Sequence, residues 1–236
     1  ITIMDNYQET IQYFANSIES TFGDRLVSLV AYGSVINRRS EAGSDIDFFL
    51  MLQGKGQLEK DIETLHKLVQ KNSNVNIDMS LQYIDDQSEY PRNFHDGTKG
   101  TLALSYLSSA KLLKGKNIFI SMLEKLSIED YRESIKNTTG YYLDKMKRES
   151  IAKGFSDDSL KLSLKKYTSR SLIDAFLFAK KDNMDLYKGM KPDEIINMAR
   201  THNFTKDLIP SDFNDTPSDY LKLMEAIYNK IRAHKP

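Results

Sequence analysis

The first half of the chain combines two spacings of hydrophobic residues. Apolar side chains recur every three or four positions over residues 7–22 and 58–69, which predicts two amphipathic helices. Apolar and aromatic residues dominate 26–32 and 45–52, and over 75–83 they alternate strictly with polar residues, which predicts three strands. A sheet with helices packed against it, and hence an α+β domain, is therefore expected here.

Shorter signals complete this half of the chain. Residues 85–97 are rich in polar and turn-forming residues, so we expect a loop there. A short helix over 101–108 and a short edge strand over 110–113 follow, and the segment Lys114-Gly115-Lys116 ends that strand. The sheet is thus expected to have four strands.

The second half of the chain predicts helices alone. Ser127 with Asp130 three positions later forms a capping box, and Pro192 and Pro217 suit the first turn of a helix. Helices are predicted over residues 127–153, 159–181, 192–202 and from 217 onwards. The last of them carries an apolar stripe of Leu221, Met224, Tyr228 and Ile231. We therefore expect two domains, an α+β domain over 1–124 and an all-α helical bundle over 125–236.

Composition narrows the class of protein. The 236 residues are 40% hydrophobic and 28% charged, as in ordinary globular domains. No segment approaches the ~20 apolar residues that a membrane span needs, and the first residues lack the features of a secretory signal. The absence of cysteine excludes disulfides and thiolate metal ligands. These features favour a cytoplasmic protein without a membrane partner.

The charge balance bears on the kind of partner. Lys and Arg together number 33, as do Asp and Glu, so the formal net charge is zero. Proteins that hold nucleic acid through its phosphates usually carry a basic surplus. The balance therefore argues against nucleic acid as a partner and favours a small-molecule substrate. The oligomeric state stays open.

Three aspartates form the strongest chemical signal. Period-two geometry places Asp45 and Asp47 on one face of their strand, and Asp78 lies on the polar face of the strand 75–83. The opposite face, directed into the core, is expected to carry Ile46, Phe48, Leu50 and Leu52. If the two strands are neighbours, the three carboxylates converge, and two unit charges ~4 Å apart repel by about 4 kcal/mol at an effective dielectric of ~20. Such a triad predicts Mg²⁺, and two ions ~3.5–4 Å apart suit reactions at phosphorus.

A turn of small residues precedes these aspartates. Gly33 and Ser34 follow the strand 26–32, and a glycine lets the backbone approach a phosphate closely. Ser34 would begin the next helix. Its hydroxyl and the free amides of that turn would then hold the β- and γ-phosphates of a nucleotide.

The motif residues resemble the DNA polymerase beta superfamily of nucleotidyltransferases. The matching string is Tyr32-Gly33-Ser34, nine intervening residues, Ser44-Asp45-Ile46-Asp47-Phe48 and the later Asp78. The resemblance covers residues 26–83, and the helical second half looks most like the antibiotic (aminoglycoside and lincosamide) and the minimal nucleotidyltransferases. It implies the nucleotidyltransferase fold, a mixed sheet with helices, followed by the helical bundle.

The resemblance also implies roles for individual residues. Two Mg²⁺ ions would be bound by Asp45, Asp47 and Asp78, the last of them holding the catalytic ion. The triphosphate of ATP, or of another NTP, would be bound by Gly33, Ser34 and Ser44. Asp85 and Asp86 are alternatives to Asp78. Many members have a glycine where this chain has Arg38, followed by Arg39, and these arginines either reach phosphate or substrate or are solvated.

The implied reaction transfers a nucleoside monophosphate, AMP from ATP in the leading interpretation, to a hydroxyl of a small molecule and releases pyrophosphate. An aminoglycoside-like antibiotic is the expected acceptor, which would make the protein an antibiotic-resistance enzyme. Two alternatives stay open: transfer to a protein or a tRNA end, and a non-catalytic nucleotide-binding module. All three acidic positions are filled, which argues against the non-catalytic module.

The catalytic base and the remaining substrate contacts also stay open. The candidates for the base are Glu133, Asp144, Glu149 and Asp78 itself. A charged stripe at i, i+4 spacing, either a triphosphate clamp or a surface ion-pair ladder, is formed by Lys166, Arg170 and Asp174. Aromatic residues that either stack on a base or sugar or pack inside the bundle are Tyr141, Tyr142 and Tyr167.

Overall fold

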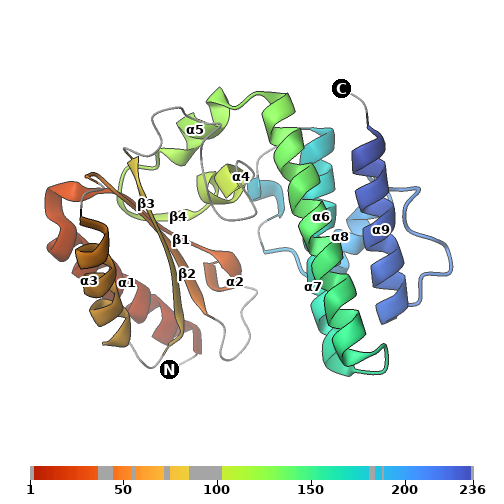
Figure 1. Cartoon of the computed structure of the whole chain (residues 1–236), viewed down its shortest axis with the longest axis horizontal. Coiled ribbons are helices and arrows are strands. Elements are labelled where there is room, and N and C mark those ends of the chain that lie inside the picture. The colour runs from red at the N-terminus through yellow and green to blue at the C-terminus, as the bar shows by residue number, and fades with distance from the viewer. Residues whose placement is uncertain are drawn as a thin grey trace. The chain divides into compact units, whose positions relative to one another are not determined.

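The computed structural model describes residues 3–36, 45–54, 57–71, 75–84, 103–180, 184–187 and 189–234. Packing divides the chain into two compact units (Figure 1). Unit 1 comprises Ile1–Asp96 and Ala103–Lys125, and unit 2 comprises Gly97–Leu102 and Leu126–Pro236. Within the described ranges, no helix is both long and apolar enough to cross a bilayer.

Unit 1 alternates helices with strands. In chain order it contains α1 (Ile3–Phe22), β1 (Leu26–Tyr32), α2 (Gly33–Ile36), β2 (Ile46–Leu52), α3 (Leu58–Gln70), β3 (Ile77–Tyr83), α4 (Ala103–Ser108), β4 (Lys111–Gly115) and α5 (Phe119–Lys125). The four strands and the helices predicted over 7–22, 58–69 and 101–108 are confirmed. Helix α5, of 7 residues, was not predicted.

The strands form one mixed sheet in the order β3-β2-β1-β4. Strand β1 is antiparallel to both β2 and β4, whereas β2 and β3 are parallel. A parallel pair needs a crossover connection, and α3 lies in that connection. The amino ends of β2 and β3 therefore meet at one end of the sheet, and their carboxyl ends meet at the other.

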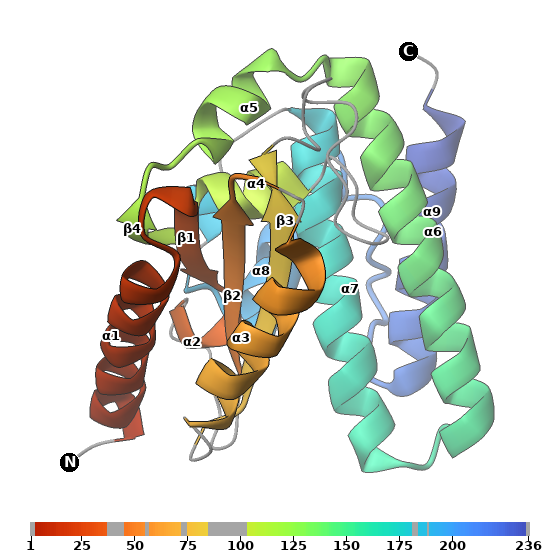
Figure 2. The ribbon, with the colours of Figure 1, turned by 60° about the vertical axis from the view of Figure 1, so that its left-hand side comes forward.

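Alternate residues of β2 enter two different cores. The core with α1 and α3 contains, as predicted, Ile46, Phe48, Leu50 and Leu52. Figures 1 and 2 show these two helices on the same side of the sheet. Phe49 and Met51 enter the other core, with α4 and α5, where the rings of Phe49 and Phe119 meet edge to face. Because side chains alternate along a strand, Asp47 leaves β2 on the same face as Phe49.

A buried charged group ties together the carboxyl ends of β2 and β3. Asp61 of α3 is 2% exposed and accepts hydrogen bonds from both terminal nitrogens of Arg25 and from the Tyr83 hydroxyl, at 2.7–2.9 Å. Arg25 also donates to the carbonyls of Gln53 and Gly54, which follow β2. Hydrogen bonding by Arg25 lowers the pKa of Asp61, and burial raises the pKa of Tyr83 to about 12. We name this group the Arg25–Asp61–Tyr83 clamp.

The described part of unit 2 is helical. Its elements are α6 (Ile128–Lys153), α7 (Asp158–Ala179), a short 3-10 helix (Met184–Tyr187), α8 (Pro192–Ala199) and α9 (Pro217–Ala233). The helices predicted for the second half are confirmed. The Ser127 hydroxyl accepts a hydrogen bond from the Asp130 amide at 3.1 Å, so the predicted cap of α6 is present.

Two details of this unit differ from the prediction. Helix α8 ends at Ala199 rather than near His202, because the following residues turn back and the Phe204 amide donates to His202 Nδ1 at 3.2 Å. Of the stripe predicted for α9, Met224 and Ile231 are buried as expected, and the other buried residues of this helix are Tyr220, Leu223 and Ile227. The predicted Leu221 and Tyr228 are only partly buried, because Tyr220 packs fully inside and turns its own face of α9 toward the bundle.

Candidate functional site

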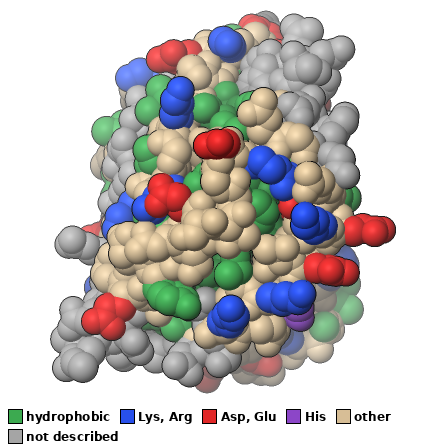
Figure 3. All heavy atoms as spheres, turned by 90° about the vertical axis from the view of Figure 1, so that its left-hand side faces the viewer, with side chains coloured by type: hydrophobic (Ala, Val, Ile, Leu, Met, Phe, Trp, Pro, Cys, Tyr) green, Lys and Arg blue, Asp and Glu red, His purple; other side chains and the backbone are tan. Residues whose placement is uncertain are grey.

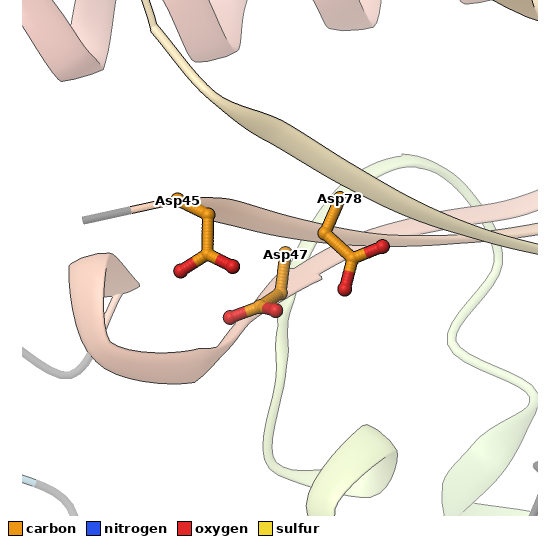
Figure 4. Close-up of side chains that lie close together, drawn as sticks. All are labelled: Asp45, Asp47 and Asp78. Carbon is orange, nitrogen blue, oxygen red and sulfur yellow. The ribbon is translucent and has the colours of Figure 1, made fainter. Parts of the chain in front are cut away.

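The register of the sheet brings three carboxylates together at the amino ends of β2 and β3. Asp47 of β2 and Asp78 of β3 are partners in the parallel pair, and Asp45 precedes Asp47 by two residues. One oxygen from each side chain lies within 4.8 Å of the other two. Figure 4 shows the three carboxylates on the same side of the strands. The convergence expected from the alternation of residues is therefore confirmed, and we name this group the acidic cluster.

The acidic cluster suits a divalent cation. Asp45 and Asp78 are exposed and Asp47 is partly buried, and within the described residues no ion pair involves the side chain of Asp45 or Asp78. Like charges ~4 Å apart repel by about 4 kcal/mol at an effective dielectric of ~20, so bound positive charge stabilises the group. Carboxylate oxygens are the hard ligands that Mg²⁺ takes in proteins. The residues present therefore fit the expected metal.

The position of Gly33 beside the acidic cluster requires a glycine. It follows Tyr32, the partner of Asp47 across β1 and β2, and its φ is +81°. A Cβ atom added to Gly33 would lie 1.8 Å from Oδ2 of Asp47, which is far inside contact distance. Only glycine therefore combines this backbone conformation with space for the Asp47 carboxylate. The sequence predicted Gly33 for a different reason, close approach to a phosphate.

Several predicted site residues lie outside the described part of the chain. They are the side chain of Ser34 and the residues Arg38, Arg39, Ser44, Asp85 and Asp86. The backbone of Ser34 lies in the short helix α2, directly after Gly33, as the sequence predicts. The phosphate-binding and alternative roles of these residues stay predictions.

A hollow of about 690 Å³ adjoins the acidic cluster at the amino ends of β2 and β3, beside the last turn of α3. Asp45 and Asp78 line it together with the amide side chains of Gln70 and Asn76. Its aliphatic lining consists of Val69, Val75 and Ile77. Sequence reasoning missed Gln70 and Asn76, because one residue ends a helix, the other precedes a strand, and no motif includes them.

The three base candidates of unit 2 all have partners within that unit. Glu149 accepts hydrogen bonds from the hydroxyls of Ser163 and Tyr167, at 2.7 and 3.1 Å. The other two candidates form ion pairs along α6, Asp144 with Arg148 at 3.0 Å and Glu133 with Lys136 at 3.9 Å. Their role as base stays a prediction.

The charged stripe of α7 is not a surface ladder. Asp174 is fully buried, and the Arg170 guanidinium lies 5.7 Å from the centre of the Tyr142 ring. Lys166 is exposed, so the stripe runs from solvent into the bundle, because the second half of α7 is buried on most sides. Tyr142 is 6% exposed and stacks on Tyr167, with ring centres 5.6 Å apart, which agrees with packing inside the bundle. The phosphate-clamp interpretation of the stripe stays a prediction.

Comparison with known proteins supports the fold. No model of a protein family matches the chain, and no curated protein has a matching sequence. Among solved structures, the chain is similar to the spectinomycin adenyltransferase AAD(9) from Enterococcus faecialis, whose structure contains ATP and spectinomycin. The TM-score is 0.51 at 13% identity, over 95% of this chain and 99% of that chain. The expected fold, the mixed sheet of a nucleotidyltransferase followed by helices, is therefore confirmed.

Proposed function

We propose that the chain is a metal-dependent nucleotidyltransferase that transfers AMP from ATP to a hydroxyl of a small molecule and releases pyrophosphate. The observation that carries the proposal is the convergence of Asp45, Asp47 and Asp78 within 4.8 Å. The likeness in fold to an adenyltransferase supports it, as does Gly33, which leaves room for the Asp47 carboxylate.

In this proposal, Asp45 and Asp47 hold two Mg²⁺ ions and Asp78 helps to hold the catalytic one. When bound, the ions neutralise the phosphate oxygens and lower the pKa of the attacking hydroxyl. Gly33 and Ser34 hold the triphosphate, and Ser44 contributes to the same contact. A carboxylate takes the proton of the acceptor hydroxyl. Among the base candidates, Asp78 is favoured, because it belongs to the acidic cluster.

The proposed acceptor is a small antibiotic of the aminoglycoside type. The structural neighbour is named for its action on spectinomycin, which makes that compound the first acceptor to test. The zero net charge of this chain supports a small acceptor over nucleic acid. On the face drawn in Figure 3, basic and acidic side chains are interspersed and no continuous basic surface is visible.

The test is incubation of the purified chain with MgATP and a panel of spectinomycin and aminoglycosides, followed by mass spectrometry. One acceptor is expected to gain the mass of AMP, with pyrophosphate released in equal amount. The variant Asp47→Asn should form no product while folding normally by circular dichroism. Equal product in this variant and the wild type would contradict the metal-dependent mechanism. A cell lysate with tagged ATP tests the alternative, since a labelled protein or tRNA would replace the small-molecule acceptor.

A further inference from the structure

The acidic cluster has two different flanks. Across the sheet, Tyr32 of β1 pairs with Asp47 of β2, which in turn pairs with Asp78 of β3. Gly33 follows Tyr32 and lies against the Asp47 carboxylate. The Gly33 flank and the Asp78 flank therefore lie on opposite sides of Asp47, as the order of the strands requires.

The hollow of about 690 Å³ opens on the Asp78 flank. Of the three clustered aspartates, Asp45 and Asp78 line it, so it reaches the cluster from the side of β3. Its aliphatic lining packs on the core of α1 and α3. The amide side chains of Gln70 and Asn76 are exposed and add hydrogen-bonding groups. Among the described residues, no Lys or Arg lines the hollow.

The geometry of transfer at phosphorus distinguishes the two flanks. In the proposed reaction, the acceptor oxygen bonds to the α-phosphorus while the bond to the bridging oxygen of the leaving pyrophosphate breaks. The acceptor proton passes to a carboxylate. The attacking and leaving oxygens lie roughly in line, so the acceptor and the pyrophosphate occupy opposite sides of the phosphorus. Because the triphosphate is proposed to bind at Gly33 and Ser34, the acceptor must approach the phosphorus from the Asp78 flank.

We propose that the hollow is the acceptor subsite and that Gln70 and Asn76 determine its specificity, an inference that rests on the proposed function. An amide side chain both donates and accepts hydrogen bonds, so it can pair with hydroxyl and amino groups alike. The aliphatic lining suits the carbon face of a saturated ring. Because no Lys or Arg lines the hollow among the described residues, an acceptor that carries phosphate finds no side-chain cation there. The subsite therefore suits a hydroxylated ring with amino groups rather than a nucleic acid end.

The kinetic test introduces positive charge into the hollow. Gln70→Lys and Asn76→Lys each remove an amide partner and repel a protonated amine. With an acceptor from the panel, each should raise the acceptor KM by about tenfold or more, equivalent to about 1.4 kcal/mol of binding. The KM for ATP should stay unchanged, because the nucleotide lies on the other flank.

The matched control is Gln12→Lys, which makes the same charge change on α1 at an exposed glutamine that does not line the hollow. It should leave both KM values unchanged. Equal effects of Gln12→Lys and Gln70→Lys on the acceptor KM would overturn the subsite. So would a change of similar size in the KM for ATP, in either direction, which would place the nucleotide in the hollow instead.

A binding measurement tests the subsite without turnover. The side-chain amide signals of Gln70 and Asn76, identified by their loss in the two lysine variants, are followed by NMR on the isotope-labelled full chain. Mg²⁺ and a non-hydrolysable ATP analogue are present, and the probe is deoxystreptamine, a diamino cyclitol. Both signals should shift saturably while that of Gln12 does not. Absence of shifts, or stronger shifts with inositol phosphate, overturns the proposal.

The two proposals fail in different ways. If the wild type transfers AMP normally and the lysine variants behave as it does, the subsite is wrong and the proposed function stands. If no acceptor receives AMP and Asp47→Asn matches the wild type in every assay, the proposed function fails and the acceptor role of the hollow fails with it.

Discussion

Charged side chains gather at both ends of the strand pair β2 and β3, and the two groups differ in composition and surroundings. At the amino ends, Asp45, Asp47 and Asp78 bring three negative charges within 4.8 Å. At the carboxyl ends, Asp61 is buried, and its two oxygens accept hydrogen bonds from the guanidinium of Arg25 and the hydroxyl of Tyr83. The amino ends thus gather charges of one sign, whereas at the carboxyl ends the negative charge of Asp61 is paired with the positive charge of Arg25.

The difference separates the proposed function, at one end of the strand pair, from stability, at the other. In the clamp, each charge has a partner, and these contacts offset the cost of burying Asp61. In the acidic cluster, like charges raise the free energy of the folded chain until a cation binds. Folding alone gains nothing from such a cluster, so its presence points to a ligand. The comparison predicts that substitutions at the two ends will have opposite consequences.

The largest expected effect is that of Asp78→Asn on catalysis. If the acidic cluster is the proposed metal site, loss of one carboxylate should lower kcat by about 10³-fold, or about 4 kcal/mol. Stability without Mg²⁺ should stay the same or rise slightly, because a like-charge contact is removed. Initial rates of pyrophosphate release and urea unfolding measure the two quantities.

The control for this variant is Asp24→Asn, at an exposed aspartate of unit 1 outside the acidic cluster. It should change neither rate nor stability. A loss of stability in Asp78→Asn as large as its loss of activity would show that Asp78 serves the fold.

The next effect is that of Asp61→Asn, which should lower stability and leave kcat unchanged. Asp61→Asn leaves Arg25 facing a neutral side chain in a buried group, which should lower the free energy of unfolding by about 3 kcal/mol. The kcat of the folded fraction should stay near the wild-type value, because the clamp lies at the far end of the strands from the acidic cluster. Urea unfolding measures stability, with Glu63→Gln on the same helix as the exposed control.

The pH dependence of this loss identifies charge as its cause. Arg25 lowers the pKa of Asp61 from its ordinary value of 3.8. The charged form is thus favoured in the folded state, so its stabilisation is complete above 3.8 and disappears as pH falls through the lower folded pKa. The difference in free energy of unfolding between the wild type and Asp61→Asn should therefore become smaller below pH 3.8. A constant gap would assign the loss to packing instead.

The sequence predicts the acidic cluster far better than the clamp. Alternation along two strands is enough to place Asp45, Asp47 and Asp78 on matching faces, and only the adjacency of the strands had to be assumed. In the clamp, Asp61 of α3 is 36 positions from Arg25 and 22 positions from Tyr83, and no periodicity relates these residues. Sequence patterns therefore reveal sites that repeat a local geometry, whereas contacts between distant segments require the fold.

Two other residues show the same limit. The requirement for Gly33 depends on where the Asp47 carboxylate lies, which follows from the pairing of β1 with β2. Asp174 occupies a position where spacing alone leaves a surface ladder open, yet it is fully buried. Helical spacing places residues on one face, but neighbouring helices decide whether that face meets solvent.

A smaller effect is expected from two glycines that follow strands, Gly33 directly after β1 and Gly54 shortly after the end of β2. Gly33 and Gly54 have φ values of +81° and +79°, so Gly→Ala should cost each about 1–2 kcal/mol of stability. A Cβ at Gly33 would strike Asp47, whereas at Gly54 the nearest atom is Nε of Arg25 at 3.9 Å. Only Gly33→Ala should therefore also lower kcat, by about 10²-fold, through displacement of the carboxylate.

The glycine pair is its own control, because both substitutions impose the same backbone strain. Thermal unfolding measures the shared loss, and pyrophosphate release measures the difference. Equal activity in the two variants, at temperatures where both are folded, would show that the Asp47 carboxylate can move aside without consequence.

The smallest effect concerns Mg²⁺ and the stability of the folded chain. If the ion binds only the folded state with a Kd of ~1 mM, ~10 mM Mg²⁺ raises the free energy of unfolding by about 1.4 kcal/mol. The wild type and Asp61→Asn should gain this equally, since the clamp takes no part in binding the ion. Asp45→Asn and Asp78→Asn should lose most of the gain, and Na⁺ at matched ionic strength controls for screening. If Mg²⁺ stabilised both aspartate variants as much as the wild type, the ion would bind outside the acidic cluster. The three adjacent negative charges of the cluster would then not be explained by a bound cation.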